Sequence, residues 1–134
     1  MGKLQPGMKY SHEFTVSEKM LAKNVGSGLV SVLATVMMIA GMEEAAVETV
    51  QSSLEDGYTT VGTHVDVSHE AATPVGMKVR FEAELLEISP NGKGLTFRVT
   101  ASDEKEIIGQ GIHKRVIVPW AKFEEKTGAK GARA

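Results

Sequence analysis

The stretch LVSVLATVMMIAGMEEAAVETVQSSL, residues 29–54, decides the fold of this chain. Its composition favours helix, and it is followed by Glu-Asp-Gly at 55–57, where Gly57 suits a left-handed helix cap. We therefore expect a long helix that begins at about Leu29, or somewhat later, and ends at about Leu54. Because its first half is apolar nearly all round, this helix must be covered on several sides.

Glu43 stands out within this helix because it falls in an apolar stripe. At 100° per residue it lies about 20° from the centre of a line of apolar side chains. An unpaired carboxylate on a core face is costly and must be partnered, neutralised or used. We predict that the stripe faces the core and that Glu43 is a site residue or a paired acid at a subunit contact. The apolar members of the stripe are Val36, Ala40, Val47, Val50 and Leu54.

The remainder of the chain alternates apolar and polar side chains, which is typical of antiparallel strands with one packed face. After a strand at 10–16 and a short helix at 17–24, strands are expected at 59–71, 77–86, 95–102 and 106–118. A phase slip at Leu85-Leu86 predicts a bulge. A curved sheet of about five strands around one long helix is an α+β architecture, the hot-dog fold. We expect one domain over 1–134, ordered from about 8 to 123, with a frayed tail at 124–134.

Composition limits the function further. The 134 residues carry a formal charge of -2, which is no footprint for nucleic acid. The chain has no cysteine, so disulfides and thiolate chemistry are excluded. The apolar run from Leu29 to Met42 is too short to cross a bilayer, and the start lacks a signal-peptide pattern. We expect a cytoplasmic protein without nucleic-acid or membrane partners.

His69 and Thr35 are the other site candidates. His69 ends the second strand and shares the parity of Val65 and Val67, with Val61 on the same face, so it is predicted to point inward. Imidazole moves protons near neutral pH, and a carboxylate can orient it. On a continuous helix Thr35 lies about 12 Å from Glu43, and a helix that begins near Thr35 would leave free backbone N–H groups beside its hydroxyl.

Structural interpretations of these residues stay open at this point. His69 is as consistent with a satisfied core histidine, and threonine in an apolar helix usually bonds back to the preceding turn. Strand parity disfavours a metal site built from His69, His64 and Glu43. The other three histidines, His12, His64 and His113, are expected at the surface. Glycines within the strands, at 62, 109 and 111, mark bulges or close approaches.

Three segments carry a resemblance to a known family. They are VLATVMMIAGMEEAA at 32–46, VGTHVDVSHEAATPVG at 61–76 and IGQGIHKRVI at 108–117. Together they resemble the fluoroacetyl-CoA thioesterase family of hot-dog proteins over roughly residues 8–123. The resemblance implies hydrolysis of an acyl-CoA thioester by a homodimer with its sites at the subunit interface, and an assembly larger than a dimer stays open. It implies no cofactor, because CoA is part of the substrate.

Carried over by residue, the resemblance implies a catalytic group of Thr35, Glu43 and His69. Glu43 is then either the nucleophile, through an anhydride, or a general base on water, while His69 activates water and protonates the leaving thiolate. The Gly62 N–H is implied as an oxyanion donor, and Arg115 as a contact to CoA. For Arg115 the structural alternative is a surface strand residue.

One departure from the family concerns the segment just before Thr35. The family carries phenylalanines there, whereas residues 24–30 read NVGSGLV, without an aromatic. We therefore expect a small or medium acyl chain packed against Leu29, Met37 and Met38 rather than selection for fluoroacetyl. Two alternative functions are a non-catalytic acyl-CoA or fatty-acid binding module and another hot-dog enzyme such as an enoyl-CoA hydratase, whose motif is not found.

Overall fold

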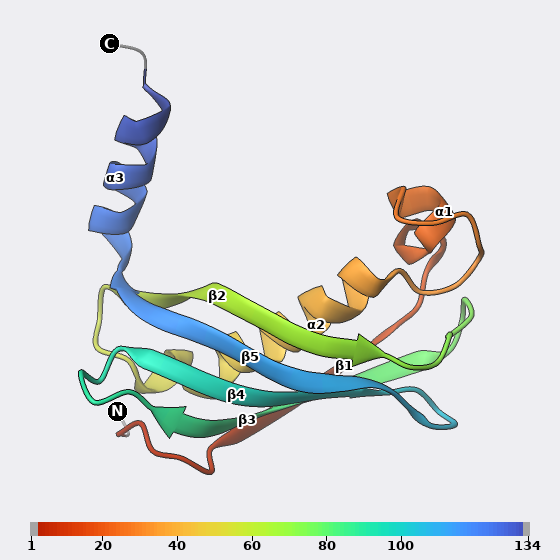
Figure 1. Ribbon diagram of the computed structural model, residues 1–134, viewed down its shortest axis with the longest axis horizontal. Coiled ribbons are helices and arrows are strands. Elements are labelled where there is room, and N and C mark those ends of the chain that lie inside the picture. Colours follow the sequence, from red (N-terminus) through yellow and green to blue (C-terminus); the bar gives the residue numbers. More distant parts are fainter. Residues whose placement is uncertain (1–2, 133–134) are drawn as a thin grey trace.

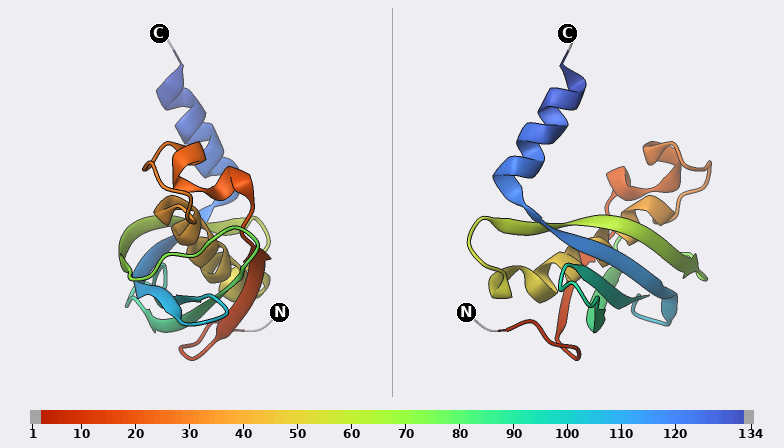
Figure 2. Two further views of the ribbon diagram at one scale, coloured as in Figure 1. Left: turned by 90° about the vertical axis from the view of Figure 1, so that its right-hand side faces the viewer. Right: turned by 60° about the vertical axis from the view of Figure 1, so that its left-hand side comes forward.

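A computed structural model describes residues 3–132. The chain forms a five-stranded antiparallel sheet in the order β1-β3-β4-β5-β2, curved around one helix, α2 (Figures 1 and 2). The predicted α+β architecture is thus present. The elements, in chain order, are β1 (Lys9–Thr15), the 3-10 helix η1 (Glu18–Met20), α1 (Ala22–Val25), α2 (Thr35–Val50), the 3-10 helix η2 (Gln51–Ser53), β2 (Tyr58–His69), β3 (Lys78–Ile88), β4 (Gly94–Ser102), β5 (Ile107–Pro119) and α3 (Trp120–Gly131).

The core lies between the concave face of the sheet and α2. Phe81, Leu85 and Phe97 project from the central strands and are fully buried. Gly41 allows α2 to pass close to the sheet, since a Cβ there would meet the Phe81 ring at 2.5 Å. Burial of this apolar area is the main stabilising contribution, as in other domains of this size.

The helix begins later than Leu29 and ends before Leu54. It opens at Thr35, because residues 26–34 form bends that follow the left-handed Gly26. At the other end, Gln51 caps α2 and η2 follows it directly. Gly57 has the expected positive φ of 87°, but in the turn before β2 and not as the helix cap. The free backbone N–H groups of the first turn therefore do lie beside the Thr35 hydroxyl.

The part of the stripe around Glu43 does not face the core, although its last two members, Val50 and Leu54, are buried. The face of α2 packed on the sheet carries Met38, Met42, Ala45, Ala46 and Val50, whose centre lies about 120° around the helix from that of the Glu43 stripe at 100° per residue. Val36 is 49% exposed and the Glu43 side chain 40% exposed. Helix α2 has two apolar faces, and periodicity alone does not tell which of them packs on the sheet.

Three register shifts adjust the strands, including one between Ala101 and Ser102 where β4 pairs with β5. The one predicted at Leu85-Leu86 is present, since the β3–β4 register shifts between Leu85 and Glu87. A second, in β2, shifts the register between Gly62 and His64, so Val61 does not share the parity of Val65 and Val67 as predicted. Among the described residues β2 pairs only with β5, which leaves its other side an open edge.

The C-terminal segment from Trp120 to Gly131 is a helix. Helix α3 follows β5 directly and projects away from the sheet (Figure 1), with every described residue exposed. Its first N–H, on Trp120, donates to the Gly57 carbonyl at 2.8 Å. Residues 124–131, expected as part of a frayed tail, are thus helical, and the flexibility of the tail stays a prediction; residues 133–134 lie outside the described range.

Candidate active site

Thr35 and His69 form the first part of the site. Thr35 is the first residue of α2 and His69 the last of β2, and Thr35 Oγ1 lies 2.6 Å from His69 Nδ1. The expectation that His69 points inward towards the helix agrees with this contact. Within residues 3–132, the other ring nitrogen, Nε2, is buried and has no hydrogen-bond partner. A buried nitrogen of this kind is a usual place to hold a substrate or a water molecule.

A cavity of about 330 Å³ opens beside this pair. Thr35, His69 and Glu70 supply its polar wall, and burial lowers the pKa of His69, which keeps the imidazole neutral. The apolar wall comes from the segment before α2 and the turn after β2, namely Ala22, Val30, Val32, Leu33, Ala71 and Ala72.

Glu43 lies with a different set of residues, two turns further along α2. Its Oε2 is 3.3 Å from Arg115 Nη1 and 3.6 Å from His113 Nε2. Gly62 of β2 makes room for this carboxylate, because a Cβ there would stand 2.7 Å from Oε2. We predicted that a glycine within a strand marks a place where another group comes close; at Gly62 that group is the Glu43 carboxylate.

Arg115 is buried, not a surface residue. Its Nε donates to Thr60 Oγ1 at 2.8 Å and its Nη2 to the Thr60 carbonyl at 3.0 Å, while Nη1 faces Glu43. Burial lowers the pKa of Arg115, and Glu43 opposes that shift by favouring the cation. The guanidinium is thus fixed by β2 and presents one N–H to the carboxylate.

His113 completes this cluster, although it was expected at the surface. Its side chain is 1% exposed. The His64 carbonyl accepts a hydrogen bond from Nδ1 at 2.8 Å, so Nε2 is the unprotonated nitrogen and accepts from Arg115 Nη1 at 3.2 Å. Burial, first of all, lowers the pKa of His113 and keeps this tautomer neutral.

The structure therefore brings the predicted site residues together in two groups. Thr35 and His69 touch at the start of α2, whereas Glu43 lies with Gly62 and Arg115, about 12 Å further along the helix axis. Sequence reasoning missed His113 and Thr60. A signal for His113 existed: it shares the inward parity of Arg115 on β5, and of the glycines at 109 and 111.

The three residues expected to line the acyl pocket, Leu29, Met37 and Met38, lie in different environments. Met38 is fully buried in the core, and Met37 packs partly on the same core. Leu29 is 95% exposed on the bend before Thr35. The prediction that Met38 lines an acyl pocket is wrong because the side of α2 that carries it packs on the sheet.

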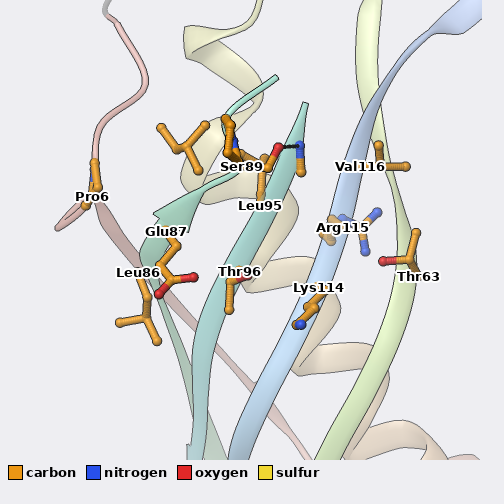
Figure 3. Close-up of a pocket in the computed structure, with 13 residues that line it drawn as sticks. Pro6, Thr63, Leu86, Glu87, Ser89, Leu95, Thr96, Lys114, Arg115 and Val116 are labelled. Atoms are coloured by element: carbon orange, nitrogen blue, oxygen red, sulfur yellow. Dashed lines mark hydrogen bonds between the residues drawn. The ribbon is translucent and has the colours of Figure 1, made fainter. Parts of the chain in front are cut away.

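A separate hollow of about 610 Å³ lies near the β2 bulge, at the turn between β3 and β4 (Figure 3). Thr63, Lys114 and Arg115 contribute to its wall, together with Glu87 of β3. Ser89 accepts a hydrogen bond from the Gly94 N–H at 2.8 Å, which closes the turn at its rim. Arg115 thus lies between this hollow and the Glu43 carboxylate.

Residues 3–132 contain no group of three or more His, Asp or Glu side chains placed to hold a metal ion. Within the same range, no helix is long and apolar enough to cross a membrane.

Comparison with known proteins decides the family. The profile of the fluoroacetyl-CoA-specific thioesterase family matches residues 16–121. The chain belongs to this family. A fluoroacetyl-CoA thioesterase from Streptantibioticus cattleyicolor is 32% identical over 133 residues, which cover 95% of this chain and 94% of that protein. Family membership confirms the predicted class, an acyl-CoA thioester hydrolase, over the two alternatives.

Solved structures agree with this assignment and confirm the hot-dog fold. A structure of the fluoroacetyl-CoA thioesterase FlK superposes with a TM-score of 0.91 at 31% identity, over 98% of this chain and 100% of that one. A threonine-to-serine variant of FlK in complex with acetyl-CoA gives 0.90 at 31% identity, over 96% and 100%. A hypothetical protein of the thioesterase superfamily from Thermus thermophilus gives 0.86 at 30% identity, over 96% and 94%.

Proposed function

We propose that this thioesterase hydrolyses a small or medium acyl-CoA, with Thr35, Glu43 and His69 as its catalytic group. The observation that carries the proposal is the contact of 2.6 Å between Thr35 Oγ1 and His69 Nδ1, which leaves a buried, unpartnered Nε2 beside a cavity. This is the arrangement of an oriented base with one nitrogen free for a reacting proton.

His69 acts as the proton carrier. With its proton on Nδ1, the imidazole donates to Thr35 Oγ1 and offers the Nε2 lone pair to a water molecule. Because burial lowers the pKa of His69, the ring is neutral and ready to accept a proton at neutral pH. The same Nε2–H then returns the proton to the departing CoA thiolate, which regenerates the neutral ring.

Glu43 supplies the negative charge. Its carboxylate either attacks the thioester carbon and expels the CoA thiolate, which leaves an anhydride that water activated by His69 then opens, or takes the proton of the attacking water in place of His69 and passes it to the thiolate. Arg115 holds Oε2, and the half-exposed side chain leaves Oε1 available. Gly62, which the Glu43 carboxylate approaches, and His69 are seven residues apart on β2, too far for one thioester to span within a subunit. The proposed group is therefore completed across the dimer, with Glu43 of one subunit facing Thr35 and His69 of the other. Hydroxylamine would trap an anhydride as a hydroxamate on Glu43, a mass change that the general-base route does not produce.

Gly62 and Arg115 are the proposed substrate contacts on the Glu43 side. A glycine at 62 lets a carbonyl oxygen approach the β2 backbone closely, which suits the oxyanion role. Lys114 and Arg115 both border the hollow of about 610 Å³ but face opposite sides of β5, so a CoA phosphate there would meet Lys114, while the Arg115 guanidinium stays directed to Thr60 and Glu43. Leu29 remains the proposed acyl contact from the bend before Thr35.

The protein is proposed to act as a homodimer. Strand β2 has 12 residues and an open edge, and such an edge is a ready template for pairing with another chain. The second apolar face of α2, with Val36, Ala40 and Val47 around Glu43, lies uncovered by the protein's own sheet. Pairing of two β2 edges would cover both features. The cytoplasmic location expected from the sequence remains a prediction.

The size of the cavity supports a short substrate. About 330 Å³ is near the lower end of ligand pockets in proteins, and its apolar wall is built from small and branched side chains. An acetyl to hexanoyl group suits this space better than a long chain.

Thiol release from a panel of acyl-CoAs, acetyl to decanoyl, tests the proposal. The chain has no cysteine, so a disulfide reagent reports only the CoA that is set free. We expect turnover on the shorter esters, and its loss in His69→Ala with a folded, thermally stable protein. Turnover that is undiminished in His69→Ala, or a sharp preference for fluoroacetyl-CoA, would contradict the proposal.

A further inference from the structure

Two parts of the molecule project beyond the open edge of β2, at opposite ends of the sheet. Figures 1 and 2 show α3 rising at one end and α1, with the bend that follows it, at the other. Helix α3 is tied to the start of β2 by the hydrogen bond from Trp120 to Gly57. The bend at 26–34 leads into Thr35, which contacts His69 at the end of β2.

Both projections expose apolar side chains. Leu29 and Val30 on the bend are 95% and 60% exposed, and Trp120 and Phe123 on α3 are 52% and 40% exposed. Trp120 and Phe123 are three residues apart and share one side of α3. A helix of 12 residues that includes Gly128 and buries none of its side chains is marginal in water without a packing partner.

If two β2 edges pair in antiparallel fashion, opposite ends of the two strands become neighbours. The start of one β2 then lies beside the end of the other, so α3 of one subunit meets the bend at 26–34 of its partner. The reach is sufficient, because α3 extends about 18 Å at 1.5 Å per residue and the two strands are only about 4.8 Å apart. A second copy of this chain is therefore the occupant that fits between the two projections.

We propose that α3 of one subunit packs on the segment 26–34 of the other, and that Trp120 and Phe123 form an aromatic wall of the partner's acyl cavity. This inference rests on the thioesterase and the dimer proposed above. It deepens them by assigning a specificity element to a part of the chain outside both site clusters.

The assignment explains a feature of the sequence. Residues 24–30 hold no aromatic side chain, and the cavity beside Thr35 and His69 is lined within its own subunit by small and branched side chains. Two rings supplied by the partner would close its outer side and limit the length of the acyl chain. Aromatic residues bring a large apolar area for little loss of side-chain entropy, which suits them to this use.

Cross-linking tests the contact directly and needs no activity. Because the chain has no cysteine, Phe123→Cys and Leu29→Cys can be made as separate variants and mixed after exchange of subunits. A short bismaleimide should join the two variants in the mixture. Lys105→Cys, at the exposed turn between β4 and β5, is the control, and should not join to Leu29→Cys. Absence of the Phe123–Leu29 product in a dimer of normal sedimentation would overturn the inference while leaving the dimer intact.

The second measurement is the acyl-length profile. In Phe123→Ala we expect the ratio of kcat/KM for decanoyl-CoA to that for acetyl-CoA to rise at least tenfold, whereas Lys126→Ala, one turn further on the same helix, should leave it unchanged. Trp120 is the only tryptophan, so its emission should shift to longer wavelength in Phe123→Ala as the wall loosens. An unchanged ratio and emission would refute the wall. Wild-type protein that is inactive on every ester would instead refute the proposed function, whatever the cross-linking shows.

Discussion

Gly62→Ala displaces the Glu43 carboxylate without touching the core. A methyl group at this position would stand 2.7 Å from Glu43 Oε2, and 3.3 Å from Arg115 Nη1 and from His113 Cε1. The oxygen must retreat by about 0.7 Å to reach an ordinary contact of 3.4 Å. It is the end of a flexible side chain on the open side of α2, so it can move, whereas the buried arginine and histidine cannot.

The retreat should cost activity rather than stability. The contact between Arg115 Nη1 and Glu43 Oε2 is already 3.3 Å long, and a further displacement takes it beyond hydrogen-bond distance. A misplacement of about 1 Å in a reacting group costs up to about 100-fold in rate, so we expect kcat to fall by about 10- to 100-fold, equivalent to about 1.4–2.7 kcal/mol. The pair is partly exposed, and the free energy of unfolding should stay within about 1 kcal/mol.

The assay is thiol release at saturating acyl-CoA, beside urea unfolding of the same preparations. Gly94→Ala is the matched control, because it adds the same methyl group to a strand and meets only the Ser89 side chain, at 3.0 Å. It should keep the wild-type kcat. A Gly62→Ala enzyme with wild-type kcat would refute the reasoning, because it would mean that the position of Glu43 does not matter for turnover.

Three more predictions concern pH, packing and the guanidinium. Burial lowers the pKa of His69 and of His113 below 6.5, so as the pH falls the unfolded chain binds protons before the folded protein does. The free energy of unfolding should therefore decrease below about pH 6.5. Urea titrations should show a weaker decrease in His113→Gln. For the same reason the acid limb of kcat/KM should lie below pH 6.5, and a limb above 6.5 would count against His69 as the base. Gly41→Ala presses a methyl group on the Phe81 ring at 2.5 Å and should destabilise the fold by about 1–3 kcal/mol, measured by urea unfolding; an unchanged midpoint would show that the ring can yield. In Arg115→Lys, a single ammonium group cannot replace the guanidinium, which donates two hydrogen bonds to Thr60 and one to Glu43, so kcat should fall about tenfold. Wild-type kinetics would show that the planar guanidinium is not needed.

Local pattern was enough to predict most of the fold. Period-2 alternation located the strands, the turn residues separated them, and the phase slip at Leu85-Leu86 located a bulge. Glu55-Asp56-Gly57 located the break after the helix, although the cap itself is Gln51 and Gly57 lies in the turn before β2. These features depend on residues close in sequence, so a single sequence contains the information that they need.

The orientation of α2 could not be obtained in the same way. Its two apolar faces differ little in hydrophobicity, and the decision depends on Gly41, which lets the helix approach Phe81 of a distant strand. The stripe around Glu43 was correctly recognised as apolar, yet it is turned to the side that we propose for a partner subunit. Periodicity shows that a face of a helix is apolar, but it does not show which part of the protein, or which partner, covers that face.

Parity arguments succeeded for His69 and failed for Val61 because of the bulge at Gly62–His64. A bulge adds one residue to the strand, so the side chains before it point to the opposite face of the sheet from the one that simple alternation predicts. In the sequence, Gly62 is the only sign of this bulge. His113 was missed for another reason. A histidine on a strand is read as exposed by its type, whereas its place between the His64 carbonyl and Arg115 is a long-range contact.

Comparison of turnover with binding in Glu43→Gln is the most direct test of the central claim. The substitution keeps the size of the side chain and removes its charge. Thiol release and the dissociation constant of a non-hydrolysable thioether analogue of the best substrate would be measured on the same preparations. The account predicts that kcat falls at least about 1,000-fold, some 4 kcal/mol, with the dissociation constant unchanged within about threefold. A variant that still turns over at a rate near wild type would contradict the account and leave Glu43 as the structural partner of Arg115.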